Sequence, residues 1–218
     1  MGWCIRQCRP DLEYHPSRLQ SVTNAAQVKH LKLCNEVLQE LQEFCDAGLT
    51  FKGKAFDWDA SILATTDDAS FAQEQLVIDD ENILPHRSQL ARMSLITGPE
   101  LWDGDEPTAH IVSFKSAVIN RVCKSTMAAE TKAKIAGVAE VHQVRAIITD
   151  MHNKLDRVNW ETSSAKTRKC LWLTDCEDLA SHLHNSVHRQ VTEPRIASIW
   201  PVFGNCSGKE QMGSTTKP

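Results

Sequence analysis

The chain has 218 residues, of which 41% are hydrophobic and 24% are charged, a composition close to that of ordinary globular proteins. This length allows one α/β domain with an extension, or two small domains. The formal net charge of -4 argues against a strongly basic nucleic-acid binder, because affinity for phosphates comes from Lys and Arg. It leaves room for a local basic patch, or for a metal ion that supplies positive charge at a site.

The eight cysteines include no Cys-x-x-Cys pair, and the N-terminus is too short and broken to be a signal peptide. We therefore expect reduced thiols in an intracellular protein, cytoplasmic or nuclear, rather than a disulfide framework. No apolar run approaches ~18 residues, so we expect no membrane span.

The first half of the chain predicts one helix and three strands. Residues 24–46 carry apolar side chains at a spacing of three to four, typical of an amphipathic helix. Residues 62–66 predict a short strand that ends at Asp67 and Asp68. Residues 79–89 are polar, contain a proline and predict a loop. Two further strands, at 90–97 and 109–115, follow this loop and are joined by a stretch rich in turn residues.

The second half predicts a long helix, a strand and a shorter helix. Residues 126–153 show the strongest helical periodicity in the chain, and Ser125 or Thr126 can cap this helix. Residues 169–174 form a short apolar strand, and 175–184 follow as a helix. The order predicts an α/β fold with a mixed sheet, in which three antiparallel strands are followed by a parallel strand, flanked by helices.

Three acids stand at the ends of these elements: Asp68, Glu130 and Asp175. If the first and fourth strands pair in parallel, their carboxyl ends lie side by side, where open α/β sheets bind ligands. Glu130 lies a whole number of turns before Ile148, at 3.6 residues per turn, and so shares the buried face of its helix. An acid on a buried face needs a partner, and a divalent cation such as Mg²⁺ is a good one.

Each acid also has a simpler interpretation. An Asp after a strand is often a turn residue or a helix cap. Glu130 could interact with the helix dipole in the first turn, or pair with Lys134 or Arg121.

Basic residues gather just before the long helix. Lys115, Arg121 and Lys124 lie in a stretch of eleven residues that contains no acid and ends at Ser125. These four residues could contact nucleic-acid phosphates beside a metal site. The alternative is an ordinary solvated loop.

Several segments, in this order, resemble copia-type retrotransposon polyproteins. Residues 9–12 (Arg-Pro-Asp-Leu) and 28–32 resemble the stretch that follows the polymerase palm in that family. Residues 68–72 (Asp-Ala-Ser-Phe-Ala) resemble the start of its ribonuclease H domain. Residues 122–131, which contain Ser-Thr-Met-Ala-Ala-Glu, resemble the start of its acidic helix, and 173–179 resemble its third acidic segment.

The resemblance implies a ribonuclease H fold, a mixed five-stranded sheet flanked by helices. It also implies hydrolysis of the RNA strand of RNA–DNA hybrids with two Mg²⁺ (or Mn²⁺) ions. Asp68 would bridge both ions, and Glu130 and Asp175 would each hold one of them. Hybrids would be recognised through backbone shape and 2′-hydroxyls.

The resemblance also implies a division of the chain and a missing partner. Residues 1–58 would be a connection-like helical segment, 59–197 a ribonuclease H-like domain incomplete at its C-terminal end, and 198–218 an irregular tail. The rest of the polyprotein, including the polymerase palm, would be absent from this chain.

The sequence departs from the family near its end. The family carries a fourth acid in an Ala-Asp-x-Leu-Thr-Lys segment, whereas no aspartate follows Asp178 here, and Pro201 interrupts the one candidate fifth strand at 199–203. We therefore expect a truncated fragment and three possible functions. The first is a ribonuclease H that is intact or impaired. The second is an inactive remnant that only binds nucleic acid. The third is an interaction module that uses the helix at 24–46.

Overall fold

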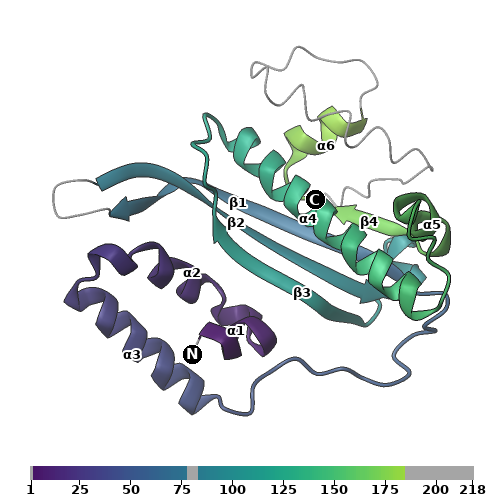
Figure 1. Ribbon diagram of the computed structural model, residues 1–218, viewed down its shortest axis with the longest axis horizontal. Coiled ribbons are helices and arrows are strands. Elements are labelled where there is room, and N and C mark those ends of the chain that lie inside the picture. The colour runs from purple at the N-terminus through teal and green to yellow at the C-terminus, as the bar shows by residue number, and fades with distance from the viewer. Residues whose placement is uncertain (1, 78–82, 185–218) are drawn as a thin grey trace.

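The computed structural model describes residues 2–77 and 83–184, and its centre is a mixed sheet with the strand order β3-β2-β1-β4 (Figure 1). The strands are β1 (Ile62–Val77), β2 (Ile83–Thr97), β3 (Ala109–Val118) and β4 (Cys170–Leu173). The first three pair antiparallel in chain order, and β4 lies parallel to β1. This confirms the predicted fold class. The candidate fifth strand at 199–203 lies outside the described residues.

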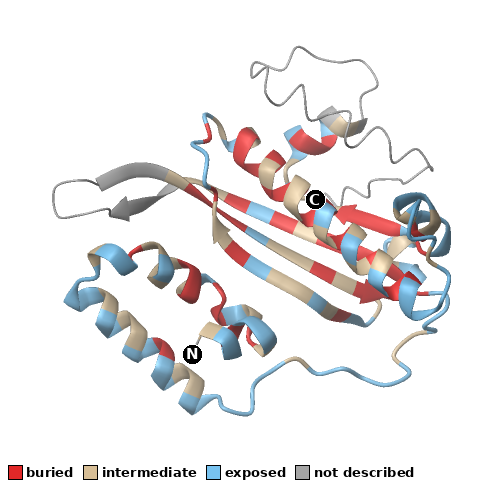
Figure 2. Ribbon diagram, in the orientation of Figure 1, coloured by how far each residue is buried: buried red, intermediate tan, exposed pale blue. Residues whose placement is uncertain are grey.

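Helices cover both faces of this sheet. They are α1 (Gly2–Cys8), α2 (Tyr14–Ser21), α3 (Val28–Glu43), α4 (Thr126–Met151), α5 (Trp160–Thr167) and α6 (Glu177–His184), with 3-10 turns η1 (Pro10–Leu12), η2 (Thr23–Ala25) and η3 (Pro99–Asp103). In Figure 1, α4 crosses the sheet over β1 and β2, and α1–α3 gather beside β3. Buried residues recur along α4 and fill most of β4 (Figure 2).

α4 forms almost as predicted because its local signals agree. The hydroxyl of Ser125 accepts a hydrogen bond from the Ala128 amide at 3.1 Å, as an N-cap does. Val141 and Ile148 then pack with Leu63 of β1. This helix joins the antiparallel part of the sheet to β4, which is the crossover that a parallel pairing requires.

The sequence prediction was wrong about the length of the first hairpin. β1 runs for 16 residues and does not stop at residue 66, so Asp67 and Asp68 lie inside the strand. Residues 83–89, predicted as a loop, belong to β2, and Pro85 falls where the pairing with β1 changes register. A proline is tolerated at such an irregularity because no ladder hydrogen bond is lost there.

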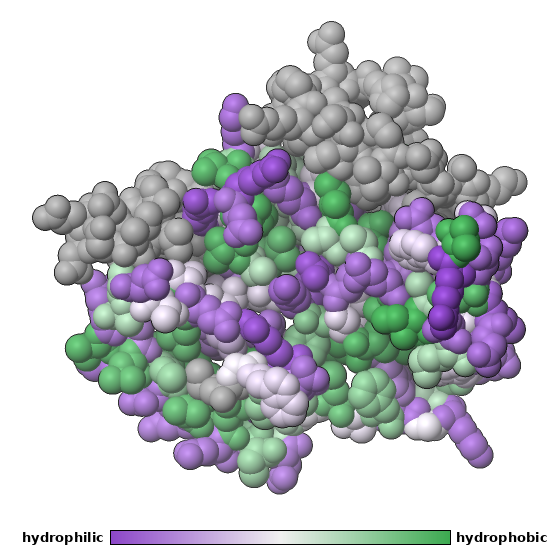
Figure 3. Space-filling view, viewed as in Figure 1, coloured by the Kyte–Doolittle hydropathy of each residue, from purple (hydrophilic) through white to green (hydrophobic). Residues whose placement is uncertain are grey.

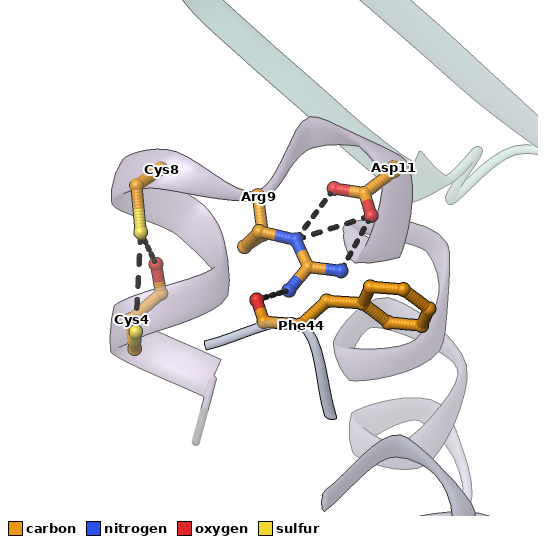
Figure 4. A network of polar contacts seen from close by, with 5 residues as sticks. All are labelled: Cys4, Cys8, Arg9, Asp11 and Phe44. Carbon is orange, nitrogen blue, oxygen red and sulfur yellow. Dashed lines mark hydrogen bonds and ion pairs between the residues drawn. The ribbon is translucent and has the colours of Figure 1, made fainter. Parts of the chain in front are cut away.

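The Arg9-Pro10-Asp11 motif holds the N-terminal helices together (Figure 4). Arg9 is buried, and its guanidinium donates to both carboxylate oxygens of Asp11, with the shortest bond at 2.7 Å. It also donates to the Phe44 carbonyl, at the end of α3, at 3.1 Å. The motif therefore closes this segment around a small core of Ile5, Leu12 and Val37.

α3 has two apolar sides where the sequence predicted one stripe. Val37 is buried and Leu41 packs partly against the same small core. By contrast Val28, Leu31 and Leu38 are 72%, 63% and 40% exposed. Hydrophobic side chains accordingly appear at the surface over the N-terminal helices (Figure 3).

The structure also bears on the state of the cysteines and on membrane-spanning helices. The cysteines of the described residues are free thiols, with Cys206 outside that range. No helix within residues 2–77 and 83–184 is long and apolar enough to cross a membrane.

Candidate metal centre

The register of β1 and β4 places Asp68 and Asp175 at the same level of the sheet. The last ladder pair joins Thr66 to Leu173, and each acid follows two residues later on its own segment. Beyond this pair β4 ends, because the Thr174 hydroxyl accepts a hydrogen bond from the Cys176 amide at 3.2 Å and turns the chain. Both acids are exposed at the resulting edge.

Glu130 reaches this edge from the start of the second turn of α4. Small side chains at Ala128, Ala129 and Ala133 pack with Ala69 of β1, so the helix lies close to the strand. Glu130 is buried, as its helical position predicted. The three acids thus converge, with one carboxylate oxygen of each within 4.8 Å of the others.

Burial and mutual repulsion make this cluster receptive to a cation. Burial, followed by the charge of Asp68, raises the pKa of Glu130 to about 7, although a hydrogen bond from the Ala69 amide opposes this rise. The Oε2 atom of Glu130 is buried and has no hydrogen-bond partner among the described residues. Carboxylate oxygens of this kind are hard ligands that suit Mg²⁺.

The spacing of the carboxylates also fits a divalent ion. Two oxygens bound to one Mg²⁺ lie at most about 4 Å apart, twice the Mg–O distance of ~2.0–2.1 Å. The observed limit of 4.8 Å is slightly longer, and small rotations of the exposed Asp68 and Asp175 side chains can close the difference. The residues present therefore fit a metal held by Asp68, Glu130 and Asp175.

Asp67, next to Asp68, serves a different purpose that the sequence prediction missed. Its side chain points to the opposite side of the strand, where it is buried against α4. There Asp67 Oδ2 lies 3.0 Å from the Nζ atom of Lys134, with both side chains at most 1% exposed. Burial raises the pKa of Asp67 to about 6, while Lys134 opposes the rise.

Lys134 therefore pairs with Asp67. The sequence alone had also allowed a pair between Lys134 and Glu130. One signal was available, because Lys134 lies one turn after Glu130 and so falls on the buried face of α4. Gly137 follows on the same side. A β-carbon there would meet Asp67 Oδ2 at 2.7 Å and the Thr65 hydroxyl at 2.9 Å.

The predicted phosphate-contacting residues divide into two groups. Arg121 and Lys124 are exposed in the loop before α4, at the end of the helix that carries Glu130. Ser125 closes that loop, with its hydroxyl engaged as the N-cap of α4. Lys115 is exposed on β3, two strands away from β4, and lines the same cleft as Asp68. Arg121, Lys124 and Ser125 thus lie just before the helix that carries Glu130, and Lys115 lies at the cleft beside Asp68.

A cleft beside Asp68 gives access to the centre. It has a volume of about 240 Å³ and is bounded by the sheet at Thr66 and Met93 and by the N-terminal segment at Tyr14. Asp68 opens onto this cleft, so a ligand can approach the acid edge past the N-terminal helices.

The strand order and the acid cluster together define an α/β protein with a mixed sheet and a candidate metal centre at its edge. Among solved structures, the chain is similar to the N-terminal ribonuclease H domain of a Mycobacterium tuberculosis protein, determined as a fusion with maltose-binding protein. The two chains are 9% identical, with a TM-score of 0.40 over 70% of this chain and 81% of that one. No protein-family model and no curated protein matches the chain.

Proposed function

We propose that this protein hydrolyses the RNA strand of RNA–DNA hybrids with Mg²⁺ or Mn²⁺ at Asp68, Glu130 and Asp175. The convergence of these three carboxylates within 4.8 Å, at the open end of β4, carries the proposal. The sequence resemblance to copia-type ribonuclease H domains supports this reaction, and the order of the acids along the chain agrees with it.

Each residue has a role in this proposal. As the family resemblance implies, Asp68 would contact both ions, while Glu130 and Asp175 would each hold one. Bound ions would activate the attacking water and stabilise the leaving oxygen. Arg121 and Lys124 would hold the hybrid by its phosphates, so that recognition depends on backbone shape and 2′-hydroxyls.

We further propose a copia-type retrotransposon as the origin of the chain. Support comes from the order of the resembling segments and from their positions. Residues 68–72 lie on β1, 122–131 lead into α4, and 173–179 connect β4 to α6.

Cleavage of a labelled RNA–DNA hybrid tests the activity. The wild type should cut the RNA strand when Mg²⁺ or Mn²⁺ is added, and Asp68→Asn should not. Asp178→Asn is the matched control, because Asp178 is an exposed acid on α6 that lies outside the cluster. Equal cleavage by the wild type and Asp68→Asn would refute the proposal.

One observation favours a second function, binding without cleavage. Among the described residues only three acids come together, whereas the resembled family uses four. Losing one ligand of a two-metal site should reduce the rate far more than the affinity. Hybrid binding that persists without turnover at any metal concentration would support this alternative, and robust turnover would reject it.

The exposed side of α3 favours a role in assembly. Val28, Leu31 and Leu38 form an apolar surface on a segment that resembles the stretch following a polymerase palm. We propose that the palm of the same polyprotein covers this surface. A purified palm domain should bind the wild type and should not bind Leu31→Glu/Leu38→Glu. Equal binding to both would reject the partner, and unfolding of the rest after removal of residues 1–50 would show that the helix is needed for packing.

A further inference from the structure

We propose that Lys134 is a positioning residue that sets the spacing of Asp68, Glu130 and Asp175, an inference that rests on the proposed metal site. It goes beyond the three acids because Lys134 contacts none of them directly. Instead its ammonium group contacts the elements that carry them.

Lys134 joins three segments at one point. It belongs to α4, one turn after Glu130. Its Nζ atom lies 3.0 Å from the carboxylate of Asp67, the residue before Asp68 on β1. The same atom donates a hydrogen bond of 2.6 Å to the carbonyl of Leu173, two residues before Asp175. Asp68 and Asp175 therefore lie one and two residues from a group that Lys134 contacts. Glu130 lies one helical turn before Lys134 itself.

The Leu173 contact lies where the sheet itself stops holding the two strands together. Leu173 is the last residue of β4 and forms the last ladder pair with β1. Beyond it no backbone ladder connects the segments that carry Asp68 and Asp175. The ammonium group of Lys134 adds one more link between β4 and β1, because it contacts both the Leu173 carbonyl and the Asp67 carboxylate.

The surroundings keep this connection rigid. Lys134 is 0% exposed, and α4 can approach Asp67 closely because Gly137 has no β-carbon. Hydrogen bonds of a charged donor in such a site are strong and directional. The position of α4 against β1 and β4 is therefore fixed at the level of the acid cluster.

Stability alone does not account for a lysine at this position. Well-packed apolar residues of similar volume often replace a buried ion pair with no loss of stability, because desolvation offsets much of the attraction. An apolar side chain, however, cannot bind the Leu173 carbonyl and the Asp67 carboxylate together. The chemistry that distinguishes Lys134 from a methionine is this double contact.

The experiment measures Mn²⁺ binding to the whole chain by electron paramagnetic resonance, beside the urea midpoint of unfolding. The variants are Lys134→Met and the double variant Lys134→Met/Asp67→Asn. The single variant leaves the Asp67 charge buried without its partner and is expected to be destabilised. The double variant removes both charges with little change of shape and should unfold near the wild-type midpoint.

We expect the double variant to bind Mn²⁺ roughly 10- to 100-fold more weakly than the wild type, the usual effect of losing a group that orients metal ligands. A double variant that regains both stability and full Mn²⁺ affinity would overturn the proposal, because the pair would then be purely structural. The matched control is Arg92→Met/Glu140→Gln. It removes another ion pair between α4 and the sheet, but on β2, which carries none of the acids, and should leave Mn²⁺ affinity unchanged.

A failure of the proposed function can be told apart from a failure of this inference. If the wild type and Asp68→Asn bind Mn²⁺ equally, the metal centre is wrong. A crystal structure of Lys134→Met/Asp67→Asn then still decides the role of Lys134. The Asp68 and Asp175 carboxylates, which lie within 4.8 Å of each other in the wild type, should move apart, and an unchanged separation would overturn the inference.

Discussion

Asp11 in the N-terminal segment and Glu130 at the acid edge show two ways in which a fold uses a carboxylate. Arg9 binds Asp11 through both oxygens, and this hydrogen bonding lowers the pKa of Asp11. Burial raises the pKa of Glu130 to about 7, the nearby charges of Asp68 and Asp175 add to the rise, and the Ala69 amide opposes it. The first acid is satisfied within the protein. The second is left with a deficit of positive charge that a metal ion can fill.

The same contrast separates two neighbouring residues on β1. Asp67 faces α4 and is neutralised by Lys134, whereas Asp68 is exposed among the acids of the cluster. Alternation along a strand is enough to give adjacent aspartates opposite roles. What neutralises an acid, rather than the acid itself, therefore indicates its function.

The largest expected effect tests this contrast directly with Asp175→Asn and Asp11→Asn. Asp175→Asn should reduce hydrolysis of the hybrid on the order of 10³-fold or more, as loss of one member of a catalytic unit does, and leave the urea midpoint nearly unchanged. Asp11→Asn should do the reverse. It should destabilise the protein by about 1–3 kcal/mol, because buried Arg9 loses a charged partner, and preserve the activity of the folded molecules.

Cleavage assays and urea unfolding of both variants measure whether Asp175→Asn loses activity alone and Asp11→Asn loses stability alone. Loss of activity in Asp11→Asn at full stability would break the comparison. It would place Asp11, which borders the cleft beside Asp68, among the catalytic groups.

The second effect concerns how closely the helix approaches the site. Gly137→Ala places a β-carbon 2.7 Å from Asp67 Oδ2, so α4 must shift away from β1. We expect a loss of about 1–3 kcal/mol of stability, typical of overpacking, together with weaker Mn²⁺ binding. Gly53→Ala is the control, since a β-carbon there meets nothing within 4 Å. Calorimetric unfolding and Mn²⁺ titration measure both, and equal stability of the two variants would contradict the close approach.

The parts of this site that the sequence predicted depend on local patterns. Helical periodicity placed Glu130 on the buried face of α4, and strand order placed Asp68 beside Asp175. The Asp67–Lys134 pair depends on two segments that are far apart in sequence and on which side of β1 each aspartate faces. That side could not be assigned while the strand was expected to end at residue 66. α5 was missed because its residues show no apolar periodicity, and it is held by packing on α4, including a Thr149–Thr167 hydrogen bond.

A smaller effect follows from the raised pKa of Glu130. Its pKa is about 7 in the folded protein against an ordinary value of 4.5, so between these pH values the folded state binds more protons than the unfolded state. Stability without metal therefore falls as the pH rises from 4.5 to 7. Glu130→Gln removes this loss and should raise the melting temperature at pH 8, by about 2–4 °C for each kcal/mol recovered in a chain of this size.

Thermal unfolding at two pH values supplies the check. At pH 4 the gain should largely disappear, because Glu130 is mostly protonated in both states of the wild type. Mn²⁺ at pH 8 should stabilise the wild type and not Glu130→Gln, since only the wild type keeps all three carboxylates. A gain of the same size at both pH values would show that the effect does not come from the charge of Glu130.

The smallest effect extends the contrast from acids to bases. Arg9 is bound by Asp11, whereas in the described part of the chain no carboxylate forms an ion pair with exposed Lys124. By the same argument Lys124 is available to a phosphate. Lys124→Gln should weaken hybrid binding uniformly across sequences and reduce the salt-dependence slope by about 1. Lys52→Gln, a change of an exposed lysine in the segment before β1, is the control for general charge. Binding isotherms at several salt concentrations should separate the two variants, and identical slopes would mean that Lys124 belongs to a solvated loop and not to the site.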